Sequence, residues 1–131
     1  MDKELYVAAQ KALENAHVPY SRFPVAAAIR MKDDTIITGV NVENASYGLA
    51  NCAERTALFS AYSLGYRAKD IIEMVVTTPR DFIVSPCGAC RQVIRELMPA
   101  DATVHMADVK GRVKSLKNAD LLPHAFTEDD L

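Results

Sequence analysis

The three cysteines of the chain lie in two short stretches, and a glutamate follows closely after the first. Cys52 belongs to "NCAERTA" (51–57), and Cys87 and Cys90 belong to "SPCGACRQV" (85–93). Three thiolates can bind one tetrahedral zinc ion and leave its fourth position open, which distinguishes a catalytic site from a closed structural one. Zinc in such a site lowers the pKa of a coordinated water to about 7, and Glu54 is the obvious base beside it. The two stretches therefore predict a catalytic zinc site.

Positive groups near this site are needed to offset the negative charge of the three thiolate ligands. Zinc bound by three thiolates carries a net negative charge, which weakens its effect on a bound water. Both stretches are expected to begin helices, and each helix N-terminus contributes about half a positive charge. Arg55 and Arg91 follow the ligands in the sequence. We expect both to donate hydrogen bonds to the sulfur atoms and so to keep the metal acidic.

Each part of the pattern also has a simpler interpretation. Glu54 follows Asn51 by three residues, so the two could form a capping box at a helix start. "CGAC" alone could be a redox pair. His17, His105 and His124 have no ligand spacing to the cysteines and are expected to be ordinary residues, although a structural site of three cysteines and one histidine stays open. The joint presence of C-x-E, P-C-x-x-C and no spare cysteine favours the catalytic zinc site.

Apolar periodicity and stop signals predict three main helices. The first helix stops at "HVPYSRFP", which has a proline near each end. Asn51 is expected to be the N-cap of the second and Gly65 its stop. Ser85 is expected to be the N-cap of the third, with Pro86 in the first helical position and Pro99 after its end. The expected helices cover 5–16, 52–64 and 86–98.

Runs of β-branched and apolar residues predict the strands between these helices. "VAAAIRM" and "TIITGVNV" are separated by Asp33 and Asp34, which indicates a hairpin, and "IIEMVVTT" indicates a buried strand. Strands that alternate with helices indicate an α/β domain with helices on both faces of a sheet. The expected strands cover 25–31, 35–42, 71–78, 102–109 and 111–116, and the tail at 121–131 is expected to be irregular or briefly helical.

The composition is that of a globular domain. The chain has 131 residues, of which 50% are hydrophobic and 24% charged, and its formal net charge is −2. This length fits one domain, 1–131, that can bury a core without disulfides. The charge gives no indication of a nucleic-acid partner. No run approaches the roughly 20 apolar residues of a membrane span and the N-terminus does not resemble a signal peptide, so we expect a cytoplasmic protein with reduced thiols.

The cysteine motifs and three further stretches resemble the cytidine deaminase family, in its small type with three cysteine ligands. Zinc deaminases carry the motif H-x-E…P-C-x-x-C, which has a variant with three cysteines. Here "CAE" (52–54) and "PCGAC" (86–90) occupy its two halves. "PYSRFPVAAA" (19–28), "GVNVENASYG" (39–48) and "LLPHAF" (121–126) look like other markers of the family. These stretches narrow the resemblance to the nucleoside enzyme.

The resemblance implies a fold and a reaction. The fold would be a three-layer α/β/α sandwich around a five-stranded mixed sheet. The reaction would be the hydrolytic deamination of cytidine and 2′-deoxycytidine in pyrimidine salvage, with one Zn²⁺ in each subunit of a homotetramer. One position departs from the family pattern, because Ala26 replaces the usual glycine, and its methyl group could crowd a helix against the sheet.

The resemblance also assigns roles to individual residues. Glu54 would shuttle the proton, next to Arg55, whose charge already gives it an expected role beside the metal ligands. The other implied roles are zinc binding by Cys52, Cys87 and Cys90, binding of the ribose 3′-hydroxyl by Asn41 and Glu43, stacking near the pyrimidine by Phe23, a hydrogen bond from the Ala53 N–H to the base O2, and contact of Phe126 with a neighbouring subunit's site.

Three alternatives to this function stay open. The first is a deaminase that acts on RNA or DNA, but a short, slightly acidic chain without a basic and aromatic groove disfavours it. The second is a deaminase of another aminated nucleoside or antibiotic, against which "NVENASYG" looks like the ordinary ribose-binding stretch. The third is a non-catalytic zinc or redox module.

Overall fold

The computed structural model describes residues 1–131 and contains one five-stranded sheet. Its strands are β1 (Ala26–Met31), β2 (Ile36–Val40), β3 (Ile71–Thr77), β4 (Thr103–Ala107) and β5 (Val113–Lys117). They lie in the order β2-β1-β3-β4-β5. β3 runs parallel to β4, and the other three neighbouring pairs are antiparallel. The expected mixed sheet is therefore confirmed.

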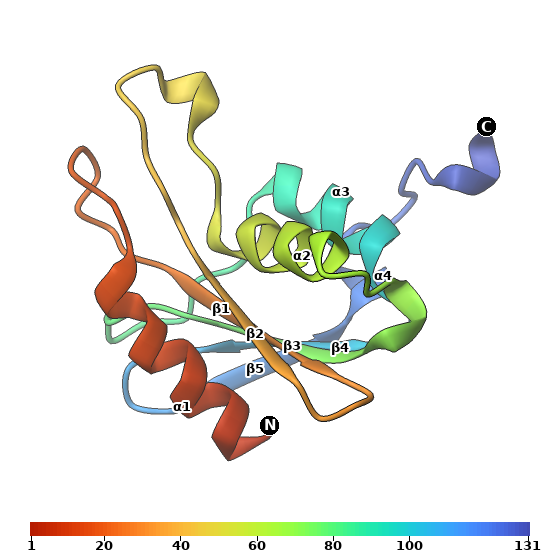
Figure 1. Ribbon diagram of the computed structural model, residues 1–131, viewed down its shortest axis with the longest axis horizontal. Coiled ribbons are helices and arrows are strands. Elements are labelled where there is room, and N and C mark those ends of the chain that lie inside the picture. The colour runs from red at the N-terminus through yellow and green to blue at the C-terminus, as the bar shows by residue number, and fades with distance from the viewer.

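Helices cover both faces of this sheet (Figure 1). α1 (Lys3–Ala12) contacts β1, β2 and β3 from one side, and α2 (Ala53–Ser63) contacts β1 and β2 from the other. α3 (Gly88–Leu97) packs against α2, and α4 (Asn118–Leu121) packs against α3. The three-layer sandwich is thus confirmed. Short 3₁₀ turns occur at Leu13–Asn15, Tyr47–Leu49, Ala68–Asp70 and Glu128–Asp130.

The alternating side chains of β1 divide the core into two parts. Ala27 and Ile29 belong to the cluster under α2 and α3, whereas Ala28 packs with Leu5 of α1. Every residue of β1 is buried, as its small side chains predict for a strand covered on both faces. Ala26 is fully buried and shares the face of Ala28. Its methyl group therefore packs on the α1 side and lies on the opposite face from α2.

α2 lies very close to β2, and Gly39 makes this approach sterically allowed. A Cβ atom at Gly39 would lie 2.3 Å from the Ala57 nitrogen and 2.6 Å from the Ala53 carbonyl oxygen. Glycine inside a strand often marks such an approach of another backbone. Gly39 therefore determines how deeply the first turn of α2 sits against the sheet.

The two helices that follow the cysteine stretches begin later than predicted. Cys52, not Asn51, is the N-cap of α2, and Cys87, not Ser85, is the N-cap of α3. Pro86 consequently precedes α3 and does not occupy its first position. Neither cysteine makes a capping hydrogen bond with its side chain. The N-cap preference for asparagine and serine is outweighed because the helix ends are placed by tertiary packing, which turns the two thiols toward each other.

The other boundaries follow the sequence more closely. Gly65 has a φ of 100° just after α2, which is the left-handed stop that the sequence predicts. The first helix ends at Ala12 and continues to Asn15 as a 3₁₀ turn. The tail at 121–131 contains one 3₁₀ turn, Glu128–Asp130, in agreement with the expectation of an irregular or briefly helical segment. α4 ends where this tail begins and was not expected. None of the helices has both the length and the apolar character needed to cross a membrane.

Candidate metal centre and active site

The three cysteine sulfur atoms meet at the N-terminal ends of α2 and α3. Cys52 and Cys87 are N-cap residues with extended backbone, and Cys90 lies three residues after Cys87 in the first turn of α3. Residues with this spacing share one side of a helix. All three sulfur atoms lie within 4.8 Å of one another. The structure therefore brings together the three residues that the sequence singled out.

The spacing of these sulfur atoms fits one zinc ion. The Sγ atoms of Cys52 and Cys87 are 3.8 Å apart. Two sulfur atoms that each lie about 2.3 Å from a tetrahedral zinc ion are separated by about 3.8 Å. A disulfide would require about 2.0 Å, and all three cysteines are free. The cluster includes no histidine, so the chain supplies three ligands and the closed site with a histidine is not supported.

The thiols strongly affect one another's ionisation. A hydrogen bond with Cys90, followed by hydrogen bonds with Arg55 and Cys87, lowers the pKa of Cys52 to about 5 although burial opposes this. The hydrogen bond with Cys52, burial and the charge of Glu54 raise the pKa of Cys90. The first anion therefore makes a second one unfavourable. A divalent cation relieves this conflict, because metal ligands bind in their deprotonated form.

Glu54 is a buried carboxyl group in the first turn of α2. Its side chain is 3% exposed, and burial, assisted by the charge of Cys52, raises its pKa to about 7. It is the only acidic residue in the first turn of either α2 or α3. The capping-box interpretation is not supported, because Asn51 is not the N-cap and no side chain caps α2. A carboxyl group with a pKa near neutrality can both accept and donate a proton.

The two arginines near the cluster have different contacts. Arg55 donates from Nη2 to the Cys52 sulfur at 3.2 Å, and this bond raises the pKa of Arg55. The Nε atom of Arg55 is buried without a hydrogen-bond partner in the chain. The expectation for Arg91 was wrong, because it donates to the carbonyl oxygens of Pro86 and Leu121, both at 2.8 Å. Arg91 therefore links two segments: the backbone just before α3 and the last residue of α4.

Asn41 holds the segment that carries Phe23. Its Oδ1 atom accepts from the Val25 N–H at 2.9 Å, and its Nδ2 atom donates to the Phe23 carbonyl at 2.9 Å. Phe23 itself is half-buried. A carboxamide has two donors and two acceptor positions. Asn41 therefore has a structural role and retains capacity to bind a hydroxyl group.

Glu43 lies beside the same segment and lines a pocket. Its Oε1 atom accepts from the N–H groups of Tyr20 and Ser21, both at 3.0 Å. Hydrogen bonding by the Ser21 side chain is the main cause that lowers the pKa of Glu43, so this side chain is an ionised acceptor at neutral pH. The pocket has a volume of about 340 Å³ and is lined by Tyr20, Ser21, Glu43, Asn44, Tyr47 and Ala50.

Ala53 and Phe126 lie in very different surroundings. Ala53 is fully buried as the first residue of α2, where N–H groups have no partner within the helix. Phe126 is 59% exposed, and its carbonyl accepts from Gln92 Nε2 at 2.8 Å. Figure 1 shows that the C-terminal segment leaves the body of the molecule beside α4. Phe126 is thus more than half exposed in the single chain.

Two residues near Phe23 were missed by the sequence analysis. The guanidinium carbon of Arg80 lies 5.5 Å from the centroid of the Phe23 ring, and the Phe82 ring centroid lies 6.1 Å from it. Both belong to the loop between β3 and Cys87. The only feature of the sequence that could have drawn attention to these two residues is that their loop ends at Cys87, a predicted metal ligand.

Comparison with known proteins agrees with this geometry. Residues 1–106 match the family model of the cytidine and deoxycytidylate deaminase zinc-binding region. The chain is 52% identical to a cytidine deaminase of Halalkalibacterium halodurans, over 100% of this chain and 98% of that protein. It is 47% identical to a cytidine deaminase of Sporosarcina psychrophila, over 100% of this chain and 96% of the relative.

A solved structure gives the same result for the fold. The crystal structure of cytidine deaminase from Burkholderia pseudomallei aligns with a TM-score of 0.91 and 46% identity, and the alignment covers 96% of this chain and 100% of that one. The three-cysteine cluster fits one Zn²⁺, in agreement with the match to a zinc-binding family model. On these grounds the chain belongs to the cytidine and deoxycytidylate deaminase zinc-binding family.

Proposed function

We propose that this chain catalyses the hydrolytic deamination of cytidine and 2′-deoxycytidine to uridine and 2′-deoxyuridine, with release of ammonia in pyrimidine salvage. One observation carries this proposal above all: a buried carboxyl group, Glu54, lies in the same helical turn that follows Cys52, beside sulfur atoms from two helix ends. The relative with 52% identity is a cytidine deaminase, and the alignment covers nearly all of both chains. We further propose that residues 1–131 act as one catalytic domain.

The metal site would consist of Cys52, Cys87 and Cys90. Bound zinc supplies Lewis acidity, which lowers the pKa of a water molecule to about 7 and makes it a nucleophile at neutral pH. The Arg55 hydrogen bond to Cys52 withdraws charge from that ligand. The N-termini of α2 and α3 add partial positive charge on the same side.

Glu54 would carry the proton through the reaction. It accepts a proton from the attacking water and donates it to N3 of the cytosine ring, which makes C4 electrophilic. The oxygen of the water adds to C4 as a hydroxyl group, and Glu54 then accepts the remaining proton of that hydroxyl and transfers it to the amine on C4. The C–N bond breaks, ammonia leaves and the oxygen remains on C4 as the carbonyl of uridine. Water is consumed and no oxidant or reductant is needed. One carboxyl group can serve both steps because its pKa of about 7 lets it accept and release a proton near neutral pH.

The nucleoside would be bound by groups on two sides of this centre. Phe23 would stack near the pyrimidine, and the Ala53 N–H would donate to the base O2. Asn41 and Glu43 would bind the ribose 3′-hydroxyl. The support is that Glu43 is an ionised acceptor on a pocket and that Asn41 has hydrogen-bonding capacity left.

The functional unit would be a cytoplasmic homotetramer with shared sites. Phe126 would reach the site of a neighbouring subunit, and its exposed ring on a segment that leaves the body of the chain supports this. The three cysteines are free, as is usual for proteins of a reducing compartment, which supports a cytoplasmic location.

An absorbance assay on cytidine, 2′-deoxycytidine and cytidine monophosphate tests the proposed reaction. We expect the zinc-loaded protein to convert the two nucleosides, with ammonia released in equal amount, and to leave the nucleotide largely unconverted. Metal analysis should find one zinc per chain. Conversion of the nucleotide alone, or of an aminated antibiotic but not cytidine, would assign a different substrate. No conversion by zinc-loaded protein would refute the proposal.

A further inference from the structure

The carbonyl groups around Phe23 are bound by side chains from distant parts of the sequence. Arg80 donates from Nη2 to the Arg22 carbonyl at 2.8 Å, and Thr78 donates to the Pro24 carbonyl at 3.0 Å. The Phe23 carbonyl itself accepts from Asn41. Three consecutive carbonyls are thus bound by three different side chains, and two of these side chains come from the residues just after β3.

Arg80 also contacts the aromatic ring of Phe23. Its guanidinium carbon lies 5.5 Å from the ring centroid, a distance at which a cation attracts the face of an aromatic ring. Phe82 lies on the same ring at a centroid separation of 6.1 Å and a tilt of 34°. The ring is therefore contacted by two side chains that are two residues apart in the loop.

The turn before Phe23 needs such support. Arg22 has a φ of 55°, in the left-handed region that residues other than glycine rarely adopt. Backbone of this kind persists only where its surroundings fix it. The hydrogen bond from Arg80 to the Arg22 carbonyl provides one such restraint, and it does so immediately before Phe23.

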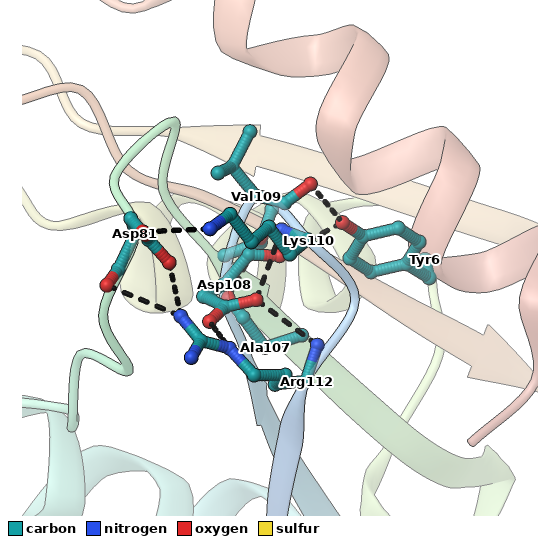
Figure 2. A network of polar contacts seen from close by, with 8 residues as sticks. Tyr6, Asp81, Ala107, Asp108, Val109, Lys110 and Arg112 are labelled. Atoms are coloured by element: carbon teal, nitrogen blue, oxygen red, sulfur yellow. Dashed lines mark hydrogen bonds and ion pairs between the residues drawn. The ribbon is translucent and has the colours of Figure 1, made fainter.

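Arg80 is itself fixed from behind by the β4–β5 turn. The Val109 N–H donates to the Arg80 carbonyl at 3.0 Å. Figure 2 shows the neighbouring residue, Asp81, paired with both Lys110 and Arg112. The loop that carries Arg80 is thus tied to the turn between β4 and β5 by a backbone hydrogen bond and two ion pairs.

Asp108 anchors this network in the core. Its side chain is buried, accepts from the N–H groups of Lys110 and Arg112 at 2.9 and 3.0 Å, and pairs with Arg112 Nε at 2.6 Å. The Tyr6 hydroxyl of α1 donates to the Asp108 carbonyl at 2.8 Å (Figure 2). The support of Arg80 therefore extends to α1 on the opposite face of the sheet from the cysteines.

We propose that Arg80 is a positioning residue for nucleoside binding, which holds Phe23 at the angle and depth required to stack on the pyrimidine. This inference rests on the proposed function, because it takes Phe23 as the stacking residue. Arg80 acts on the substrate through Phe23 and does not touch the atoms that react. Its loss therefore weakens binding of the nucleoside and leaves the proton transfers by Glu54 nearly intact.

The first test is the kinetics of Arg80→Ala in zinc-loaded protein. We expect KM for cytidine to rise about tenfold, through loss of one hydrogen bond and one ring contact, while kcat stays within about threefold of wild type. Arg67→Ala is a matched control, because Arg67 also lies over an aromatic ring, Tyr62 at 5.1 Å, and also donates to backbone carbonyls. It should change KM by less than about twofold. An equal rise in KM for both variants, or none for Arg80→Ala, overturns the inference.

The second test is a double-mutant cycle with Phe23→Ala. If Arg80 acts through the ring, then adding Arg80→Ala to Phe23→Ala raises KM by less than about twofold further. Independent, fully additive effects contradict the proposal. Calorimetric titration with uridine measures binding affinity directly, and it compares wild type, the two single variants and the double variant without turnover. A wild-type protein that binds uridine but does not deaminate cytidine contradicts the proposed function, while the binding data for the variants still decide the role of Arg80.

Discussion

At the scale of single residues, Glu54 gives the sharpest prediction. Glu54→Gln removes the proton carrier but places a neutral group of the same shape where burial already disfavours the charged form. We expect kcat for cytidine to fall by at least about 10³-fold, because one group serves both proton transfers. Zinc content and the melting temperature of the zinc-loaded protein should stay close to wild type. A variant that keeps a tenth of wild-type turnover would contradict the role of Glu54 as the proton carrier.

Arg55 gives a second prediction at this scale. Arg55→Gln removes the hydrogen bond to the Cys52 sulfur, and loss of a contact of this kind to a metal ligand typically lowers affinity or activity by about 10- to 100-fold. Competition with a chelator should show weaker zinc binding, or the assay should show lower kcat, with little change in the melting of zinc-saturated protein. Arg95→Gln, in the last turn of α3, is the control and should change neither. Zinc affinity and activity equal to wild type in Arg55→Gln would exclude the role.

The sequence could identify these residues because their chemistry is encoded locally. The three cysteines and Glu54 stand at short, recognisable spacings, and the structure brings them together at two helix ends. Arg80 carries no such pattern, because its partners, Arg22 and Phe23, lie nearly sixty residues earlier in the chain. Arg91 was assigned wrongly for a related reason. Its neighbourhood in sequence suggested sulfur contacts, whereas the fold directs it to backbone carbonyls.

At the scale of elements, the distance between α2 and β2 determines where the catalytic turn sits. Gly39→Ala would place a methyl group against backbone atoms of Ala53 and Ala57, which cannot move aside as a flexible side chain can. We expect the free energy of unfolding to fall by at least about 2 kcal/mol, which corresponds to roughly 8 °C in melting temperature for a domain of this size. Zinc affinity should fall as well, because a shift of the first turn of α2 also moves Cys52, the zinc ligand that caps this helix.

A second glycine provides the control for this prediction. Gly48→Ala places its methyl group in open space, with no atom within 4 Å. Its stability should change by no more than about 0.5 kcal/mol. Thermal melting of the two variants decides the matter, and a similar small shift for both would mean that α2 adjusts easily to the added methyl group.

Element identity followed from the sequence, but element ends did not. Hydrophobic periodicity predicted the five strands and the three longer helices, because it records which faces are buried, but it did not predict the short helix α4. The starts of α2 and α3 were misplaced because Asn51 and Ser85 are better N-cap residues than cysteine in isolation. Gly39 within a predicted strand was the visible sign of a close approach, but the sequence could not say which helix makes it.

At the scale of the whole molecule, the C-terminal segment raises the question of assembly. The Phe126 ring is 59% exposed, and the segment is joined to α3 by the hydrogen bond from Gln92 to the Phe126 carbonyl. Terminal segments are ordered mainly where something holds them. A single chain cannot show what covers the ring, and neither its periodicity nor its composition contains the contacts of a second copy. The shared site therefore has to be tested by experiment.

Mixing two inactive variants tests whether one site is built from two chains. Glu54→Ala lacks the proton carrier, and Phe126→Ala would bind the nucleoside poorly if the ring closes a neighbour's pocket. In co-expressed, mixed oligomers, some sites combine an intact Glu54 from one chain with an intact Phe126 from another. Cytidine turnover should then rise above that of either variant alone. If Phe126 served the site of its own chain, every site in the mixture would carry one defect and activity would not recover. Mass spectrometry checks that mixed oligomers have formed. Mixed oligomers without recovered activity would exclude the shared site.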